Sequence, residues 1–230
     1  MLKIGVLDSG VGGLNCLKAL QTQFPFCKFF YIADRKNCPY GNKTTQQVVG
    51  FIDKLCYKLY FTYGVDAIVL ACNTASTNAL DYVRQKYPIT IFGVVPPILK
   101  LAKNDKKILV LATENTIASK NILQQIEQVK SNAKIYRFAC ANLATLIEEE
   151  KYSFKKSAEY ALKIINEYIK KYNIDSVILG CTHYVFLQKQ LENECPQISF
   201  YNGYEELLEA VRGYLGFYFN SFNINLQKRK

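Results

Sequence analysis

The chain has 230 residues, half of them apolar and 21% charged, a composition typical of a globular protein. This length suffices for one large domain or two small ones. No apolar run approaches the roughly 18 residues of a membrane span, and the segment 1–4 enters a predicted strand without the features of a signal peptide. We therefore expect a cytoplasmic location and no membrane partner.

The net charge is +10, from 29 basic and 19 acidic residues. The lysines are spread along the chain, and only residues 228–230 form a short basic run. Nucleic-acid-binding proteins gather such charge into a patch or stripe. The sequence therefore argues against a nucleic-acid partner and predicts a mild attraction for anionic small molecules.

Eight cysteines and one histidine are present, without a C-x-x-C pair. Zinc sites usually draw on closely spaced cysteine and histidine ligands, so we expect no metal site. Most of the thiols are interpreted as small apolar core residues, and these are Cys16, Cys27, Cys56, Cys140 and Cys195.

Apolar, β-branched runs alternate with longer amphipathic stretches. The predicted strands are residues 3–7, 28–32, 67–71, 89–94, 108–112, 134–138 and 176–180. The predicted helices are about 13–23, 45–63, 75–86, 116–129, 153–172, 186–194 and 205–219. Near-continuous apolar strands are typical of parallel sheets buried on both faces. The alternation of strand and helix predicts an α/β fold.

An internal repeat divides the chain. Residues 66–74 match residues 175–183 without a gap: both begin with Asp, continue through apolar residues, and end at a cysteine followed by a polar pair. Residues 3–7 match residues 107–111 in the same way. The repeat predicts two similar doubly wound, mostly parallel-sheet domains related by a pseudo-twofold axis, with the active site between them.

The domain boundary is predicted at Pro96-Pro97, which cannot continue a helix. Residues 1–97 would form the first domain and residues 98–204 the second. Residues 205–230 are expected to return and pack on the first domain.

Polar clusters follow several predicted strands: Asp8-Ser9, Cys72-Asn73-Thr74 and Cys181-Thr182-His183. In open α/β sheets, ligands bind beyond the carboxyl ends of the strands. If the two domains face each other, the two thiols approach one ligand from opposite sides. One thiolate would remove an α-proton and the opposite thiol would deliver a proton to the other face of the carbanion, which is two-base racemisation.

Helix N-termini are expected to lower the pKa of both thiols. Asp8 and His183 would serve as local proton partners, and spacing does not decide which of them serves Cys72 and which serves Cys181.

The same residues carry a family resemblance. Five motifs occur in one order: residues 4–14, Asp34 with Pro39-Tyr40-Gly41, residues 71–76, residues 111–113 with Thr116, and residues 179–184. Together they resemble the aspartate/glutamate racemase family, and within it the glutamate racemases, from residue 4 to about residue 203.

The resemblance implies a cofactor-independent, metal-free enzyme that converts L-glutamate into D-glutamate for peptidoglycan. Cys72 would deprotonate the D-enantiomer and Cys181 the L-enantiomer, assisted by Asp8 and His183. The residues implied in substrate binding are Asp8, Ser9, Tyr40, Gly41, Asn73, Thr74, Thr113, Thr116, Thr182 and His183.

The chain departs from the family pattern at two places. The usual Thr-His-Tyr-Pro reads Thr182-His183-Tyr184-Val185, so the next helix begins without its first-turn proline. Where one acidic residue is expected, the chain has Glu148-Glu149-Glu150. The sequence does not decide which of these glutamates reaches the site.

Three alternatives stay open from the sequence. The first is a racemase for aspartate or another small amino acid, because pocket size is not readable. The second is a non-catalytic basic binding protein, and the third is a thiol redox enzyme that uses Cys72 and Cys181. The sequence also leaves open whether the chain forms a homodimer.

Overall fold

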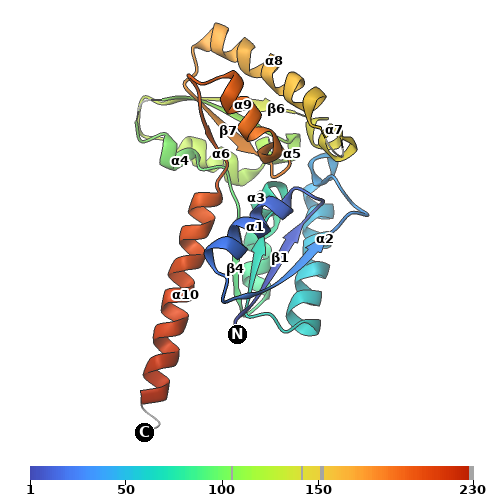
Figure 1. The fold of residues 1–230 in the computed structure, drawn as a ribbon, viewed down its shortest axis with the longest axis vertical. Helices are drawn as coiled ribbons and strands as arrows, with labels where there is room; N and C mark the ends of the chain where they lie inside the picture. The colour runs from blue at the N-terminus through green and yellow to red at the C-terminus, as the bar shows by residue number, and fades with distance from the viewer. Residues whose placement is uncertain (105, 141, 151–152, 228–230) are drawn as a thin grey trace.

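A computed structural model describes residues 1–104, 106–140, 142–150 and 153–227, with 219–227 described as backbone only. Figure 1 shows two domains, one above the other in this view. The predicted segment 205–230 falls partly on residues 228–230, which lie outside the described residues.

The first domain has a parallel sheet in the order β2-β1-β3-β4. Its strands are β1 (Lys3–Asp8), β2 (Lys28–Ala33), β3 (Ala67–Leu70) and β4 (Thr90–Gly93). Its helices are α1 (Gly13–Gln23), the 3-10 turn η1 (Tyr40–Asn42), α2 (Thr45–Tyr57), the π-helical turn η2 (Lys58–Thr62) and α3 (Asn73–Lys86).

The second domain has a parallel sheet in the equivalent order β6-β5-β7-β8. Its strands are β5 (Lys107–Ala112), β6 (Lys134–Ala139), β7 (Ser176–Gly180) and β8 (Ser199–Tyr201). The remaining elements are α4 (Ile98–Leu101), α5 (Glu114–Ile117), α6 (Lys120–Glu127), α7 (Leu143–Glu149), α8 (Lys155–Tyr172), η3 (Tyr184–Leu187), α9 (Gln188–Glu194) and α10 (Tyr204–Gln227). The prediction of two similar α/β domains with parallel sheets is confirmed.

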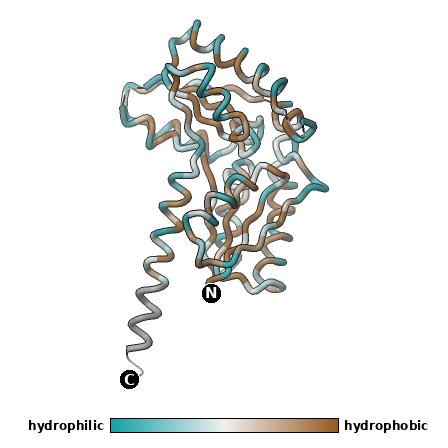
Figure 2. The backbone as a smooth tube through the Cα atoms, in the orientation of Figure 1, coloured by the Kyte–Doolittle hydropathy of each residue, from teal (hydrophilic) through white to brown (hydrophobic). Residues whose placement is uncertain are grey.

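Helices cover both faces of each sheet. In the first domain, α2 and α3 pack on one face, and α1 packs with α10 on the other. In the second domain, α7, α8 and α9 cover one face, and α4 and α6 cover the other. Figure 2 shows apolar residues along the strands inside each domain.

The last helix joins the first domain although it follows the second in the sequence. Leu207, Val211 and Leu215 of α10 belong to the core that contains Ile4 and Val6 of β1. Figure 1 shows α10 running from the second domain along the first.

Several element predictions are wrong in detail. The predicted helix 116–129 is two helices, α5 and α6, because the Ser119 side chain accepts a hydrogen bond from the backbone N–H of Ile122 and starts a new helix. The sequence reading missed β8, α4 and α7, which are all short. The last helix is longer than predicted.

Candidate functional site

The two sheets present their topological switch points to each other. The order changes direction between β1 and β3 and again between β5 and β7, which is where ligands bind in such sheets. Cys72 immediately precedes α3 and lies two residues after the last residue of β3, and Cys181 directly follows β7. Both side chains are buried, with 5% and 7% exposed.

The environment of Cys72 disfavours its thiolate form, although the residue lies at the start of a helix. Burial, together with the nearby Asp8 carboxylate, raises the pKa of Cys72 to about 12, although the backbone N–H of Ala75 and the Ser9 hydroxyl act to lower it. The backbone N–H of Ala75, at the N-terminus of α3, does act in the predicted direction, but the net change in the pKa is upward, so the prediction of a lowered pKa is wrong. The cost of desolvating the thiolate exceeds the effect of the helix dipole.

The Asp8 carboxylate joins the two domains. One oxygen, Oδ1, accepts a hydrogen bond from the backbone N–H of Gly10 at 2.8 Å, and Oδ2 accepts one from the Thr182 hydroxyl at 3.1 Å. Burial raises the pKa of Asp8 above its usual value. The hydrogen-bonding partner of the Cys72 sulfur is the Ser9 hydroxyl, at 3.8 Å. The hydrogen bond between Thr182 and Asp8 therefore crosses the interface between the domains.

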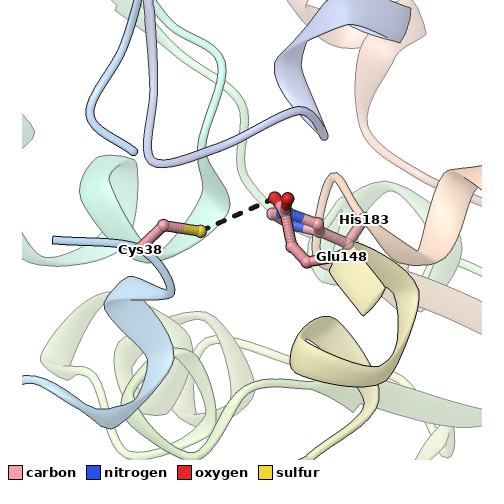
Figure 3. Close-up of side chains that lie close together, drawn as sticks. All are labelled: Cys38, Glu148 and His183. Carbon is pink, nitrogen blue, oxygen red and sulfur yellow. Dashed lines mark hydrogen bonds and ion pairs between the residues drawn. The ribbon is translucent and has the colours of Figure 1, made fainter. Parts of the chain in front are cut away.

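His183 is held between a thiol and a carboxylate. Its Nδ1 lies 3.8 Å from Sγ of Cys181, and its Nε2 lies 2.6 Å from Oε1 of Glu148 (Figure 3). Burial alone would lower the pKa of His183, but hydrogen bonds to Cys181, Cys38 and Glu148 raise it well above its usual value. Conversely, the hydrogen bond from His183 lowers the pKa of Glu148 to about 2.

Three threonines form a closed ring of hydroxyl groups across the domains. The Thr74 hydroxyl lies 2.9 Å from that of Thr113 and 3.1 Å from that of Thr116, and the latter two lie 2.9 Å apart. All three side chains are buried. The Thr113 hydroxyl also accepts a hydrogen bond from the backbone N–H of Thr116. Because hydroxyl groups rotate and both donate and accept, those of the ring are able to turn towards the carboxylate of a bound ligand.

The other predicted binding residues lie beside this ring. The Tyr40 hydroxyl donates to Asp34 Oδ2 at 2.7 Å. Gly41 is close to the second domain, because a Cβ there would lie 2.7 Å from Cβ of Thr113. Asn73 is buried and its side-chain amide donates to the Val94 carbonyl at 3.4 Å.

The structure separates the three consecutive glutamates. Glu148 reaches the site, where its Oε1 also accepts from the backbone N–H of Val11 at 3.0 Å. Glu149 is exposed. Glu150 accepts from the backbone N–H groups of Lys156 and Ser157 at the start of α8. The sequence reading missed Cys38, which is half-buried and lies 3.6 Å from Glu148 Oε1; its only sequence signal was its position beside Pro39-Tyr40-Gly41.

This arrangement suits proton transfer at a small polar molecule. One thiol comes from each domain, the carboxylate and imidazole lie nearby, and hydroxyl groups surround them. General acid–base chemistry requires such groups within hydrogen-bonding reach of the proton that moves.

Comparison with known proteins identifies the family. The sequence family described as Asp/Glu/Hydantoin racemase matches residues 31–211. This chain belongs to that racemase family. A glutamate racemase of Sulfurihydrogenibium sp. (strain YO3AOP1) is 35% identical to it over 215 residues, which cover 92% of this racemase and 82% of the relative.

Solved structures agree with this assignment. The glutamate racemase isoform RacE1 of Bacillus anthracis matches with a TM-score of 0.83 and 30% identity, over 94% of this racemase and 82% of that chain. The Escherichia coli glutamate racemase, solved with L-glutamate and an activator, matches with a TM-score of 0.83 and 26% identity, over 92% and 81% of the two chains. Among the described residues of this racemase, no helix is both long and apolar enough to cross a membrane.

Proposed function

We propose that this racemase interconverts L- and D-glutamate by two-base proton transfer between Cys72 and Cys181. The observation that carries the proposal is the placement of two buried thiols at equivalent strand ends of two facing domains. The relatives and structures named above, all glutamate racemases, support glutamate as the substrate.

In the L-to-D direction, the Cys181 thiolate removes the α-proton of L-glutamate and becomes a thiol. The planar carbanion then takes a proton from the Cys72 thiol on its opposite face, which leaves D-glutamate and a Cys72 thiolate. The raised pKa of Cys72 suits this order, because a thiol of high pKa rests in the proton-donating form. In the reverse direction the two thiols exchange roles.

The neighbouring groups assist each thiol. His183 contacts Cys181 directly, so it would carry protons to and from that sulfur. Asp8 acts near Cys72, with Ser9 as the direct hydrogen-bonding partner. The substrate carboxylates and ammonium group would be bound by the hydroxyls of Thr74, Thr113, Thr116 and Thr182, with Asn73, Tyr40 and Gly41 completing the site.

The reaction requires only groups that this chain supplies, so we propose that it proceeds without a cofactor. The product would serve peptidoglycan synthesis in the cytoplasm.

The test is solvent deuterium incorporation at Cα during incubation with L-glutamate in D2O, without added cofactor. We expect deuterated D-glutamate, because the proton that Cys72 donates equilibrates with solvent. Nuclear magnetic resonance and chiral chromatography measure the label and the configuration separately.

Two other outcomes would replace the proposal. Exchange with aspartate but not with glutamate would make this an aspartate racemase, since the acid/base chemistry is the same. If neither amino acid exchanges and the chain binds nucleic acid with strong salt dependence, the basic binding function is correct.

A further inference from the structure

Three side chains with different ligand chemistry meet beside the site. Cys38 comes from the segment after β2, Glu148 from α7, and His183 from the turn after β7. Their ligand atoms all lie within 4.8 Å of one another. Figure 3 shows the three side chains converging. In the proposed proton transfer, His183 carries protons and Glu148 is its ion-pair partner, whereas Cys38 itself transfers no proton.

One pair of these ligand atoms already has the spacing that a tetrahedral metal ion requires, and a second pair is slightly too close. Zinc binds thiolate, imidazole and carboxylate at about 2.0–2.3 Å, which places neighbouring ligand atoms about 3.3–3.6 Å apart. The distance from Cys38 Sγ to Glu148 Oε1 is already 3.6 Å. The 2.6 Å between Glu148 Oε1 and His183 Nε2 is a hydrogen bond, and it would lengthen by less than about 1 Å when an ion replaces the proton.

The backbone of Gly10 packs closely against all three ligand atoms. A Cβ at this position would lie 2.7 Å from Cys38 Sγ and 3.1 Å from His183 Nε2, and closer still to Glu148 Oε1. All three ligand atoms therefore border a backbone position without a side chain. Any other residue there would crowd the same three atoms.

The three ligands come from both domains. Cys38 belongs to the first sheet's domain, whereas Glu148 and His183 belong to the second. An ion bound by all three would add a link across the interface. It would also fix the His183 ring, whose other nitrogen contacts Cys181.

We propose that a zinc ion binds Cys38, Glu148 and His183 and reversibly inhibits the racemase by holding the two domains together. A thiolate ligand favours zinc over magnesium or calcium, which prefer oxygen. The inhibitory role rests on the proposed racemase function, whereas the metal binding does not.

Binding is tested first, on the metal-free full chain, with Co2+ as a spectroscopic substitute for Zn2+ and with calorimetric titration of Zn2+. We expect one equivalent to bind and a thiolate-to-cobalt charge-transfer band to appear. In Cys38→Ala, the band should disappear and the zinc affinity should fall at least about tenfold.

The matched control is Cys27→Ala. Cys27 lies before β2 and Cys38 lies after it, so the control removes a thiol from the opposite end of the same strand. It should bind both metals as the natural chain does. Cys38→Ser, checked by circular dichroism, replaces Cys38→Ala if the alanine variant does not fold. An unchanged cobalt band and zinc affinity in the Cys38 variant would overturn the site.

Inhibition is tested by the racemisation assay with and without Zn2+. We expect zinc to inhibit the natural chain, a chelator to restore its turnover, and Cys38→Ala to keep its turnover in both conditions. Equal inhibition of Cys38→Ala would overturn the inhibitory role and place the inhibiting ion at Cys72 or Cys181. If the metal-free chain racemises no glutamate, the proposed function fails while the cobalt spectrum still decides the metal site.

Discussion

At the scale of single residues, the two site thiols differ in their partners. Cys72 bonds to the Ser9 hydroxyl in the first domain, and Cys181 contacts His183 in the second. The repeat thus gives each domain a thiol at the same strand end, but the local chemistry is not symmetric. Each thiol is therefore expected to act on one face of the substrate only.

Replacing either thiol should separate the exchange of the α-proton with solvent from the inversion of configuration at Cα. Cys72→Ser and Cys181→Ser should each reduce racemisation by at least about 100-fold, the usual contribution of one acid/base group. Cys72→Ser should still exchange the α-proton of L-glutamate, and Cys181→Ser that of D-glutamate, because the remaining thiol works on its own face. Nuclear magnetic resonance in D2O measures both, and Cys27→Ser is the control. Near-full turnover in either variant would contradict the two-base mechanism.

The ion pair of Glu148 and His183 predicts a pH-dependent stability. The lowered pKa of Glu148, about 2, means that its contribution is present above the usual 4.5 and is lost as the pH falls towards 2. The raised pKa of His183 means that its contribution is present below the usual 6.5 and is lost as the pH rises through the native value. The pair therefore stabilises the fold most between pH 4.5 and 6.5.

Glu148→Gln should accordingly lower the free energy of unfolding most inside that window and less on both sides of it. Urea unfolding at several pH values measures the difference. The control is Glu149→Gln, since Glu149 is exposed. A destabilisation by Glu148→Gln that does not depend on pH would show that the ion pair is not its cause.

At the scale of elements, α10 ties the end of the chain to the first sheet. Its apolar side chains lie in the same core as β1 and α1. This helix completes the cover of one face of the first sheet, so the domain that holds Cys72 depends on a segment that follows the whole second domain.

Truncating a buried side chain of α10 should therefore destabilise the first domain. Leu207 is 3% exposed, and Leu207→Ala is expected to cost about 2–5 kcal/mol through lost burial and the cavity left behind. Leu14→Ala on α1 is the control, since Leu14 is 44% exposed and a surface change costs within about 0.5 kcal/mol. Denaturant unfolding compares them, and equal costs would contradict this role of α10.

At the scale of the whole molecule, the two domains are closed over the site. Hydrogen bonds cross the interface from Thr182 to Asp8, from Val11 to Glu148 and between Thr74 and Thr113. Cys72, Cys181 and His183 are buried in this closed arrangement. We therefore expect glutamate to reach the thiols only when the domains separate, which breaks these hydrogen bonds.

Thiol alkylation should report this opening. Cys72 and Cys181 should react with iodoacetamide more slowly than half-buried Cys38, because only the open state exposes them. Glutamate should slow both further by occupying the site. Mass spectrometry of the labelled peptides follows each cysteine over time. Rates for Cys72 and Cys181 equal to that of Cys38 would show that the cleft is open at rest.

Part of this picture followed from the sequence. Two similar α/β domains with parallel sheets were predictable from the apolar strands, their alternation with helices, and the matching segments that end at Cys72 and Cys181. Periodicity and repetition are properties of the sequence itself, so they do not depend on how the chain packs. The same logic placed Asp8, Thr74, Thr182 and His183 at strand ends, where side chains from different strands meet.

Tertiary structure decided the rest. The packing of the two domains decided which glutamate reaches His183. It also brought Cys38 to Glu148 and His183 and closed the ring of threonine hydroxyls. No spacing in the sequence encodes how the domains pack. The pKa of Cys72 depends mainly on its burial, which the sequence does not show, so the effect of the helix N-terminus taken alone predicted the wrong net direction. The sequence by itself determined which polar residues follow the carboxyl ends of the strands, and the packing of the domains determined the electrostatic environment of those residues.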